Sequence, residues 1–224
     1  SSKMMGANFN YNRNKRFILD GSIRWNHSNG DVRTEQSTEN FVSNIGSFSN
    51  SFNQNYTRSN SWDARLRMEW KPDTMTNIMF RPTIKYSTSD GLSSSTSASY
   101  NDDPYLYVTN PLSPESILQM AEDSLMVNTR KNNSITYSEN KCLGIMLQIN
   151  RKLNSKGRNV TLRTNVTYND NKSKSLSTSN VHLYQIKNNS GVDSVYQTNR
   201  YNLTPTKSLS YNIQATYSEP IFKA

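Results

Sequence analysis

The chain has 224 residues, of which 33% are hydrophobic and 10% aromatic, and it carries a formal net charge of +9. So few apolar residues would hardly fill an ordinary globular core, while so many aromatic residues argue against a disordered chain. A polar chain rich in aromatics fits a transmembrane β-barrel, whose lumen and loops are polar and whose strands are apolar on one face only.

Other classes of protein are disfavoured by simple features. No stretch approaches the roughly 20 consecutive apolar residues of a membrane helix, and the first residues lack the apolar core of a signal peptide. Because an exported protein needs such a signal, and the chain opens directly into a strand pattern, we expect it to begin inside a longer protein. Cys142 is the single cysteine and is interpreted as a small strand residue. Basic residues are scattered rather than gathered, so no nucleic-acid partner is expected.

The first predicted hairpin spans residues 4–12 and 16–26, on either side of a turn at Asn12–Lys15. Apolar and polar residues alternate along both segments, which is the period of a strand with two different faces. The apolar set is Met5, Ala7, Phe9, Tyr11, Phe17, Leu19, Gly21, Ile23 and Trp25.

The second predicted hairpin spans 60–70 and 77–87 around the turn sequence Lys71-Pro72-Asp73-Thr74. A helix would mix its apolar and charged residues, whereas a strand separates them onto two faces. One face holds Trp62, Ala64, Leu66, Met68, Trp70, Ile78, Phe80, Pro82, Ile84 and Tyr86.

A third hairpin is predicted at 141–153 and 159–169, around a turn at Asn154–Gly157, and a seventh strand at 208–218 ends at Glu219-Pro220. The apolar residues are Leu143, Ile145, Leu147, Ile149, Val160, Leu162, Val166, Tyr168, Leu209, Tyr211, Ile213, Ala215 and Tyr217.

Long polar segments separate these hairpins, at about 26–60, 87–140 and 170–207. Short turns alternating with long loops are typical of an outer-membrane barrel, in which the periplasmic turns are short and the extracellular loops are long. We therefore expect residues 1–224 to be one segment of an antiparallel up-and-down transmembrane β-barrel of about seven strands, without its plug and remaining strands. Within the second loop, Ser113-Pro114-Glu115 followed by spaced apolar residues predicts a short helix over 114–123.

Aromatic residues gather at the ends of the predicted strands, as expected for rings anchored at the two membrane interfaces. These interface candidates are Tyr11, Phe17, Trp70, Phe80 and Tyr217 near the short turns, and Trp25, Trp62, Tyr86 and Tyr168 near the long loops. A soluble β-sandwich that buries the same face is the alternative, but it would explain neither the loop asymmetry nor the two belts.

The opposite face carries charges, which would cost roughly 2–4 kcal/mol per Arg or Lys if they met lipid at mid-depth. The candidates for lumen-facing residues are Arg24, Asp63, Arg65, Arg67, Glu69, Arg81, Lys85 and Arg163. Asp63, Arg67 and Glu69 are candidates for pairing across the inner wall. The charged face is either a solvated wall held by such ion pairs or a basic path or plug-docking surface.

Two motifs resemble turns and strand ends of barrel proteins from the Bacteroidetes outer membrane: Trp70 to Pro82 (WKPDTMTNIMFRP) and Tyr217 to Ile221 (YSEPI). The pattern of the whole chain resembles the TonB-dependent-receptor-like group of outer-membrane β-barrels. The resemblance implies a barrel of about 22 strands that is closed by a plug and imports a ligand with energy from an inner-membrane partner.

No catalytic constellation, phosphate loop, metal spacing or cofactor motif is found, so no enzyme is expected, and His27 and His182 are interpreted as surface residues. The first functional hypothesis is a plugged importer in the bacterial outer membrane, with outer-membrane lipid, the rest of the barrel, a plug and an energy-transducing periplasmic protein as partners. The second is a non-transporting barrel that acts as a scaffold or assembly partner for other envelope proteins. A soluble surface adhesin is the third.

Overall fold

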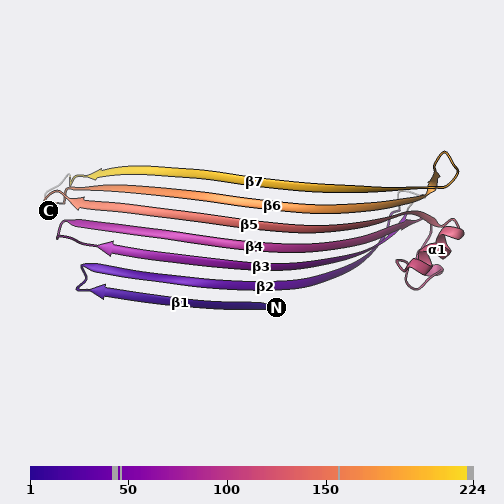
Figure 1. Cartoon of the computed structure of the whole chain (residues 1–224), viewed down its shortest axis with the longest axis horizontal. Helices are drawn as coiled ribbons and strands as arrows, with labels where there is room; N and C mark the ends of the chain where they lie inside the picture. Colours follow the sequence, from indigo (N-terminus) through magenta and orange to yellow (C-terminus); the bar gives the residue numbers. More distant parts are fainter. Residues whose placement is uncertain (42–44, 46, 156, 221–224) are drawn as a thin grey trace.

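A computed structural model describes residues 1–41, 45, 47–155 and 157–220, and it places seven antiparallel strands in one sheet in sequence order (Figure 1). The strands are β1 (Ser2–Arg13), β2 (Phe17–Glu39), β3 (Phe48–Trp70), β4 (Thr76–Tyr100), β5 (Met126–Lys152), β6 (Asn159–Lys187) and β7 (Asp193–Ser218). The predicted all-β, up-and-down order of seven strands is thus confirmed. β1 and β7 are the two edges of an open sheet, so closure into a barrel is not shown.

The short turns lie where the sequence predicts them. Between β1 and β2, Asn14 and Lys15 both adopt positive φ (52° and 55°), the backbone twist that suits a tight hairpin. Between β3 and β4, Asp73 Oδ1 accepts hydrogen bonds from the backbone N–H groups of Met75 (2.7 Å) and Thr76 (2.6 Å). At the third turn, Lys156 lies outside the described residues, as does Ile221 of the second resemblance motif.

The predicted long loops are mostly wrong, because the strands continue through them. The connections that remain are residues 40–47, 101–125 and 188–192. Strand β6 has 29 residues, which at about 3.3 Å per residue is roughly 95 Å of strand. A strand that crosses the hydrocarbon layer needs only about 9–11 residues.

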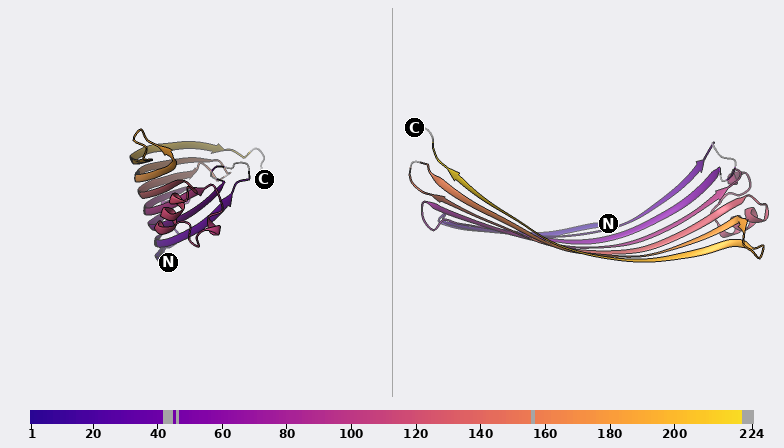
Figure 2. Two further views of the ribbon diagram at one scale, coloured as in Figure 1. Left: turned by 90° about the vertical axis from the view of Figure 1, so that its right-hand side faces the viewer. Right: turned by 90° about the horizontal axis from the view of Figure 1, so that it is seen from above.

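The added strand segments carry polar side chains on both faces, which explains why the sequence does not predict them as strands. Alternation appears in a sequence only where one face meets an apolar medium, whereas the backbone ladder forms between polar strands as well. Cross-strand pairs support it: His27 Nδ1 lies 2.8 Å from Asn60 Oδ1, and the hydroxyls of Ser28 and Ser59 are 2.8 Å apart. The long sheet twists along its length, as Figure 2 shows.

The connection of residues 101–125 forms a small folded unit at the end of the sheet opposite the turns (Figure 1). It contains a 3-10 helix, η1 (Pro104–Leu106), and the predicted helix α1 (Pro114–Glu122). Ser113 caps α1 by accepting a hydrogen bond from the Ser116 backbone N–H at 3.2 Å. Met120 of this unit is buried against Ala98 and Tyr100 of β4 and Met126 of β5, and these four residues form the buried core.

Candidate functional site

The registers of all six strand pairs bring the apolar residues onto one continuous face, which we call the band face. Directly opposed residues of an antiparallel pair share a face, so a row can be followed across the sheet. One such row is Ala7, Ile23, Ala64, Ile84, Leu143, Tyr168 and Leu209. The apolar band is the part of this face within residues 5–11, 17–25, 62–70, 78–86, 143–149, 160–168 and 209–217.

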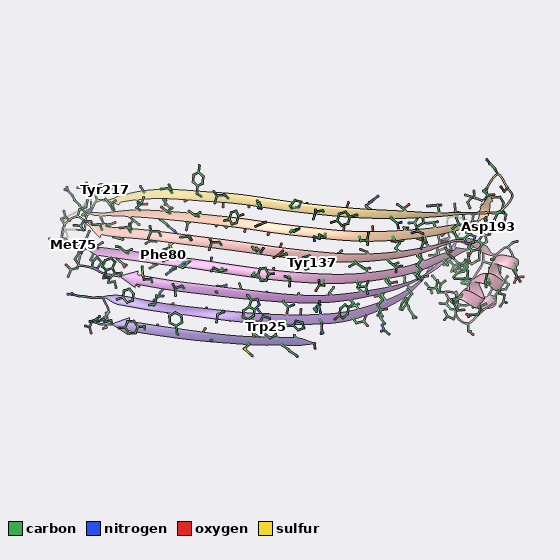
Figure 3. All side chains as sticks on the ribbon, in the orientation of Figure 1. Trp25, Met75, Phe80, Tyr137, Asp193 and Tyr217 are labelled. Carbon is green, nitrogen blue, oxygen red and sulfur yellow. The ribbon has the colours of Figure 1, made fainter. Side chains whose placement is uncertain are left out.

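The length of the apolar band along a strand matches a membrane crossing. From Phe17 to Trp25, eight steps of about 3.4 Å give roughly 27 Å along the strand, and these residues reach the about 9–11 that a tilted strand needs to cross the hydrocarbon layer. The band occupies the turn-side part of the sheet, from the level of Tyr217 and Phe80 to that of Trp25 (Figure 3). Its side chains are not covered by other described residues: Ile84 is 55% exposed and Ile213 is 65% exposed.

The predicted interface aromatics lie at the two edges of the apolar band. Trp25, Trp62 and Tyr86 are consecutive partners in one row, and the Trp25 and Trp62 rings are 6.1 Å apart. At the turn side, Tyr11 meets Phe17 edge-to-face at 6.4 Å. The remaining aromatics are Trp70 beside Phe17, Phe80 one row further from the turns, Tyr168 at the far edge, and Tyr217 at the turn side.

All eight predicted lumen candidates lie on the other face, which we call the charged face. Arg24, Asp63 and Lys85 are consecutive partners in one row. The row of Glu69 crosses the sheet through Met79 and Gln148 to Arg163.

The ion pairs on the charged face differ from those expected. Arg67 Nε lies 3.0 Å from Asp20 Oδ2, and Glu69 Oε1 lies 3.1 Å from Lys71 Nζ. Asp63, Arg67 and Glu69 therefore do not pair with one another. The reason is register: Asp20 is the direct partner of Arg67 across the β2–β3 ladder.

A hollow of about 560 Å³ on the charged face brings together Asp20, Arg65, Arg67 and Arg81. Among the described residues, the Nε atoms of Arg67 and Arg81 are shielded from solvent and make no hydrogen bond, although Arg67 Nε lies 3.0 Å from Asp20 Oδ2. The hollow lies where β3–β4 pairing is interrupted at Pro82, which has no N–H to donate. Three guanidinium groups beside one carboxylate leave the hollow with a net positive charge.

Beyond the apolar band, the strands continue as an extension, defined as residues 26–39, 48–61, 87–100, 126–142, 169–187 and 193–208. Its band face carries a second apolar row that the sequence did not predict. The row is Tyr56, Leu92, Ile135, Leu176 and Tyr201. These side chains are between 38% and 62% exposed. Only the register reveals this row, because each residue stands alone in a polar sequence.

The unit of residues 101–125 packs on the band face of the extension. Its Met120 is buried against Ala98 and Tyr100, which lie an even number of residues from Ile84 along β4 and therefore on the same face. A polar cavity of about 560 Å³ lies beneath it. Buried Asn50 donates from Nδ2 to Ser37 Oγ (2.7 Å) and to the Tyr105 hydroxyl (2.8 Å). Burial raises the pKa of the Tyr100 phenol.

At the far end of the β6–β7 hairpin, three charged or titratable side chains meet. Lys187 Nζ pairs with Asp193, and His182 Nε2 lies 3.1 Å from Asp193 Oδ2 while its ring stacks on Tyr184. Hydrogen bonds from Lys187 and then from His182 lower the pKa of Asp193. In the part of the chain that the structure describes, no three His, Cys, Asp or Glu side chains are grouped to hold a metal ion.

Comparison with known proteins adds little to this geometry. No protein-family model and no curated protein matches the chain. One solved structure, a major outer membrane protein from Thermus thermophilus, aligns with 9% identity over 90% of this chain and 91% of that one, at a TM-score of 0.17. The membrane pore complex of pneumolysin aligns with 12% identity over 95% of this chain and 31% of that one, at a TM-score of 0.11. Neither likeness is strong enough to carry an argument.

Among the described residues, no helix is both long and apolar enough to cross a membrane.

Proposed function

We propose that this chain is part of the wall of a transmembrane β-barrel in the bacterial outer membrane. The observation that carries the proposal is the apolar band, which crosses all seven strands and has the strand length of a tilted membrane crossing. Leu66 and Ile84 on this face would meet lipid, and Arg65 and Lys85 on the other would meet a wet lumen. We place the short turns in the periplasm and the extension outside the cell.

A soluble sandwich is disfavoured because nothing in the described residues covers the apolar band. Side chains such as Ile213 and Trp62 stay open over the whole turn-side part of the sheet. Exposed apolar surface of this extent needs a second layer or a lipid phase.

Spin labels can test which medium each face meets. The full-length protein, with Cys142 replaced by Ser, would carry single labels at Leu66 or Ile84 and, as matched controls one residue away, at Arg65 or Thr83. In reconstituted membranes, we expect oxygen to broaden the first pair and a water-soluble nickel complex to broaden the second. Protection of Leu66 and Ile84 from both reagents would mean a dry protein core and would refute the membrane wall.

We further propose that the parent barrel is a plugged importer of the TonB-dependent type, as opposed to a scaffold alone. The arginine hollow supports this choice. Among the described residues, Arg67 Nε and Arg81 Nε make no hydrogen bond, and buried polar groups are almost always hydrogen-bonded. A carboxylate from a plug domain or an anionic ligand in transit would supply the missing acceptors, whereas a purely scaffolding wall has no need of them.

Planar-bilayer conductance distinguishes the two roles. If a plug is held through the hollow, Arg65→Gln combined with Arg81→Gln should convert a closed full-length protein into a leaking one. Arg163→Gln, on the same face but outside the hollow, is the control. Unchanged conductance in the double variant would favour the scaffold.

A further inference from the structure

Four lysines lie on the band face just beyond the apolar band, on three neighbouring strands. Lys141 of β5 and Lys207 of β7 are the two direct partners of Asp170 on β6. One row further out, Lys172 is the partner of Glu139. We call Lys141, Lys172, Lys174 and Lys207 the lysine patch.

The opposite face of the same strands is uncharged at this height. Its residues are Asn140, Asn171, Thr206, Ser138, Ser173, Thr204, Thr136, Ser175 and Asn202. Both faces lie outside the apolar band, so a need for solubility would place charge on both. The restriction of the lysines to the band face therefore requires a reason specific to that face.

Internal ion pairs do not neutralise the lysine patch. Lys141 Nζ lies 2.9 Å from Glu139, but the contact of Lys207 with Asp170 is long, at 3.9 Å, and the Lys207 side chain is 68% exposed. Among the described residues, no carboxylate oxygen lies within 4.0 Å of the ammonium group of Lys172 or of Lys174, so neither lysine forms an ion pair. Four lysines against two carboxylates leave the patch with a net charge of +2.

We infer that the lysine patch binds the phosphate groups of an anionic lipid headgroup in the outer leaflet; this inference rests on the proposed membrane wall. Charge and position both point to that ligand. The patch follows directly on the last apolar residues of its strands, Leu143, Tyr168 and Leu209, so the first groups that it meets are headgroups. Lysine stems can lie along apolar surface while their ammonium groups reach the interface.

The inference commits to a lipid because the patch is continuous with the apolar band. An acidic protein partner would dock on the patch from water and would gain nothing from the adjoining aliphatic face. A lipid satisfies both surfaces at once, with its acyl chains against Leu143 and Leu209 and its phosphates against the lysines.

Native mass spectrometry of the full-length protein in neutral detergent can count bound lipid. The probe is lipid A with two phosphates, compared with its dephosphorylated form and with inorganic phosphate. We expect retention of the phosphorylated form only. Lys172→Gln combined with Lys174→Gln should weaken retention about tenfold or more, since each lysine near an anionic surface contributes roughly fivefold in affinity.

Two control variants separate charge at the patch from other causes. Lys172→Arg with Lys174→Arg should retain the lipid, and so should Arg130→Gln with Arg200→Gln, which removes two charges from the opposite face of neighbouring strands. Equal retention by the Lys→Gln variant overturns the inference. Displacement of lipid A by an equal concentration of inorganic phosphate also overturns it, because the site would then be one for free anions. Failure of the spin-label test at Leu66 and Ile84 is a separate result that refutes the membrane wall itself.

Discussion

The apolar band and the extension belong to the same strands, yet they differ in what fixes their side chains. In the band, nearly every second residue is apolar, and Leu66, Ile84 and Ile145 lie on one face while Arg65 and Lys85 lie on the other. In the extension, runs such as residues 93–97 are Ser or Thr on both faces, and the strands are held by the ladder and by polar cross-strand pairs. The difference teaches that alternation reports the surroundings of a strand, and not the strand itself.

The largest expected effect contrasts one leucine from each region. Leu66→Arg places a charge on the band face at mid-height, at a cost of roughly 2–4 kcal/mol, and should strongly reduce assembly. Leu92→Arg puts the same charge on the same face of the extension, where Leu92 is already 50% exposed, and should be tolerated. Heat-modified gel mobility of the full-length protein gives the folded fraction. Equal yields would mean that the band and the extension meet the same medium.

A second substitution tests whether the small core of the extension is independent of the band. Met120 is fully buried among Ala98, Tyr100 and Met126, so Met120→Ala should destabilise the unit of residues 101–125 by about 2–4 kcal/mol. Limited proteolysis should then cut this unit faster while the full-length protein keeps its folded gel mobility. Leu118→Ala, at a helix position that is 67% exposed, is the control. Loss of the folded form of the full-length protein would show that the two regions fold as one.

A smaller effect is expected from the hydrogen bonds that tie the unit to the sheet. Tyr105→Phe removes the hydroxyl that contacts Asn50 at 2.8 Å and Ser37 at 3.0 Å, at a cost of about 1 kcal/mol. Hydrogen exchange of residues 101–112 should quicken severalfold. Tyr196→Phe, on an exposed ring of β7, should change nothing there. No change for Tyr105→Phe would mean that water replaces these contacts freely.

The smallest effect is a pH dependence at the far end of the extension. The pKa of Asp193 is lowered from 3.8 in the folded state, so its contribution to stability is present above the unfolded value and is lost as pH falls through the folded value. Fraying of the β6–β7 hairpin end, followed by amide exchange, should therefore rise only below about pH 4. Asp193→Asn should fray similarly at all these pH values. If acid still induces fraying in the Asp193→Asn variant, the protonation of another group must cause it.

What the sequence could predict follows from the same contrast. The turns at Asn12–Lys15 and Lys71–Thr74, the strand faces from Trp62 to Trp70 and the Ser113-capped helix were all predicted, because each has a local pattern with a physical cause. The sequence instead predicts loops where the extension lies, since Ser, Thr and Asn on both faces give no period to detect. The pairing of Arg67 with Asp20, the arginine hollow and the lysine patch depend on register between distant strands, which no local pattern encodes.

The unbroken ladder from the apolar band through the extension restricts how such a chain can change in length during evolution. Deleting one residue from the first part of β5 would turn every later side chain of the strand to the other face and would move the charges of Glu139 and Lys141 to the charged face. Tolerated insertions and deletions should therefore come in pairs of residues and be matched on both strands of a hairpin. Relatives of this chain should differ in the reach of their strands by steps of about 7 Å, while the turn-side part keeps a constant length.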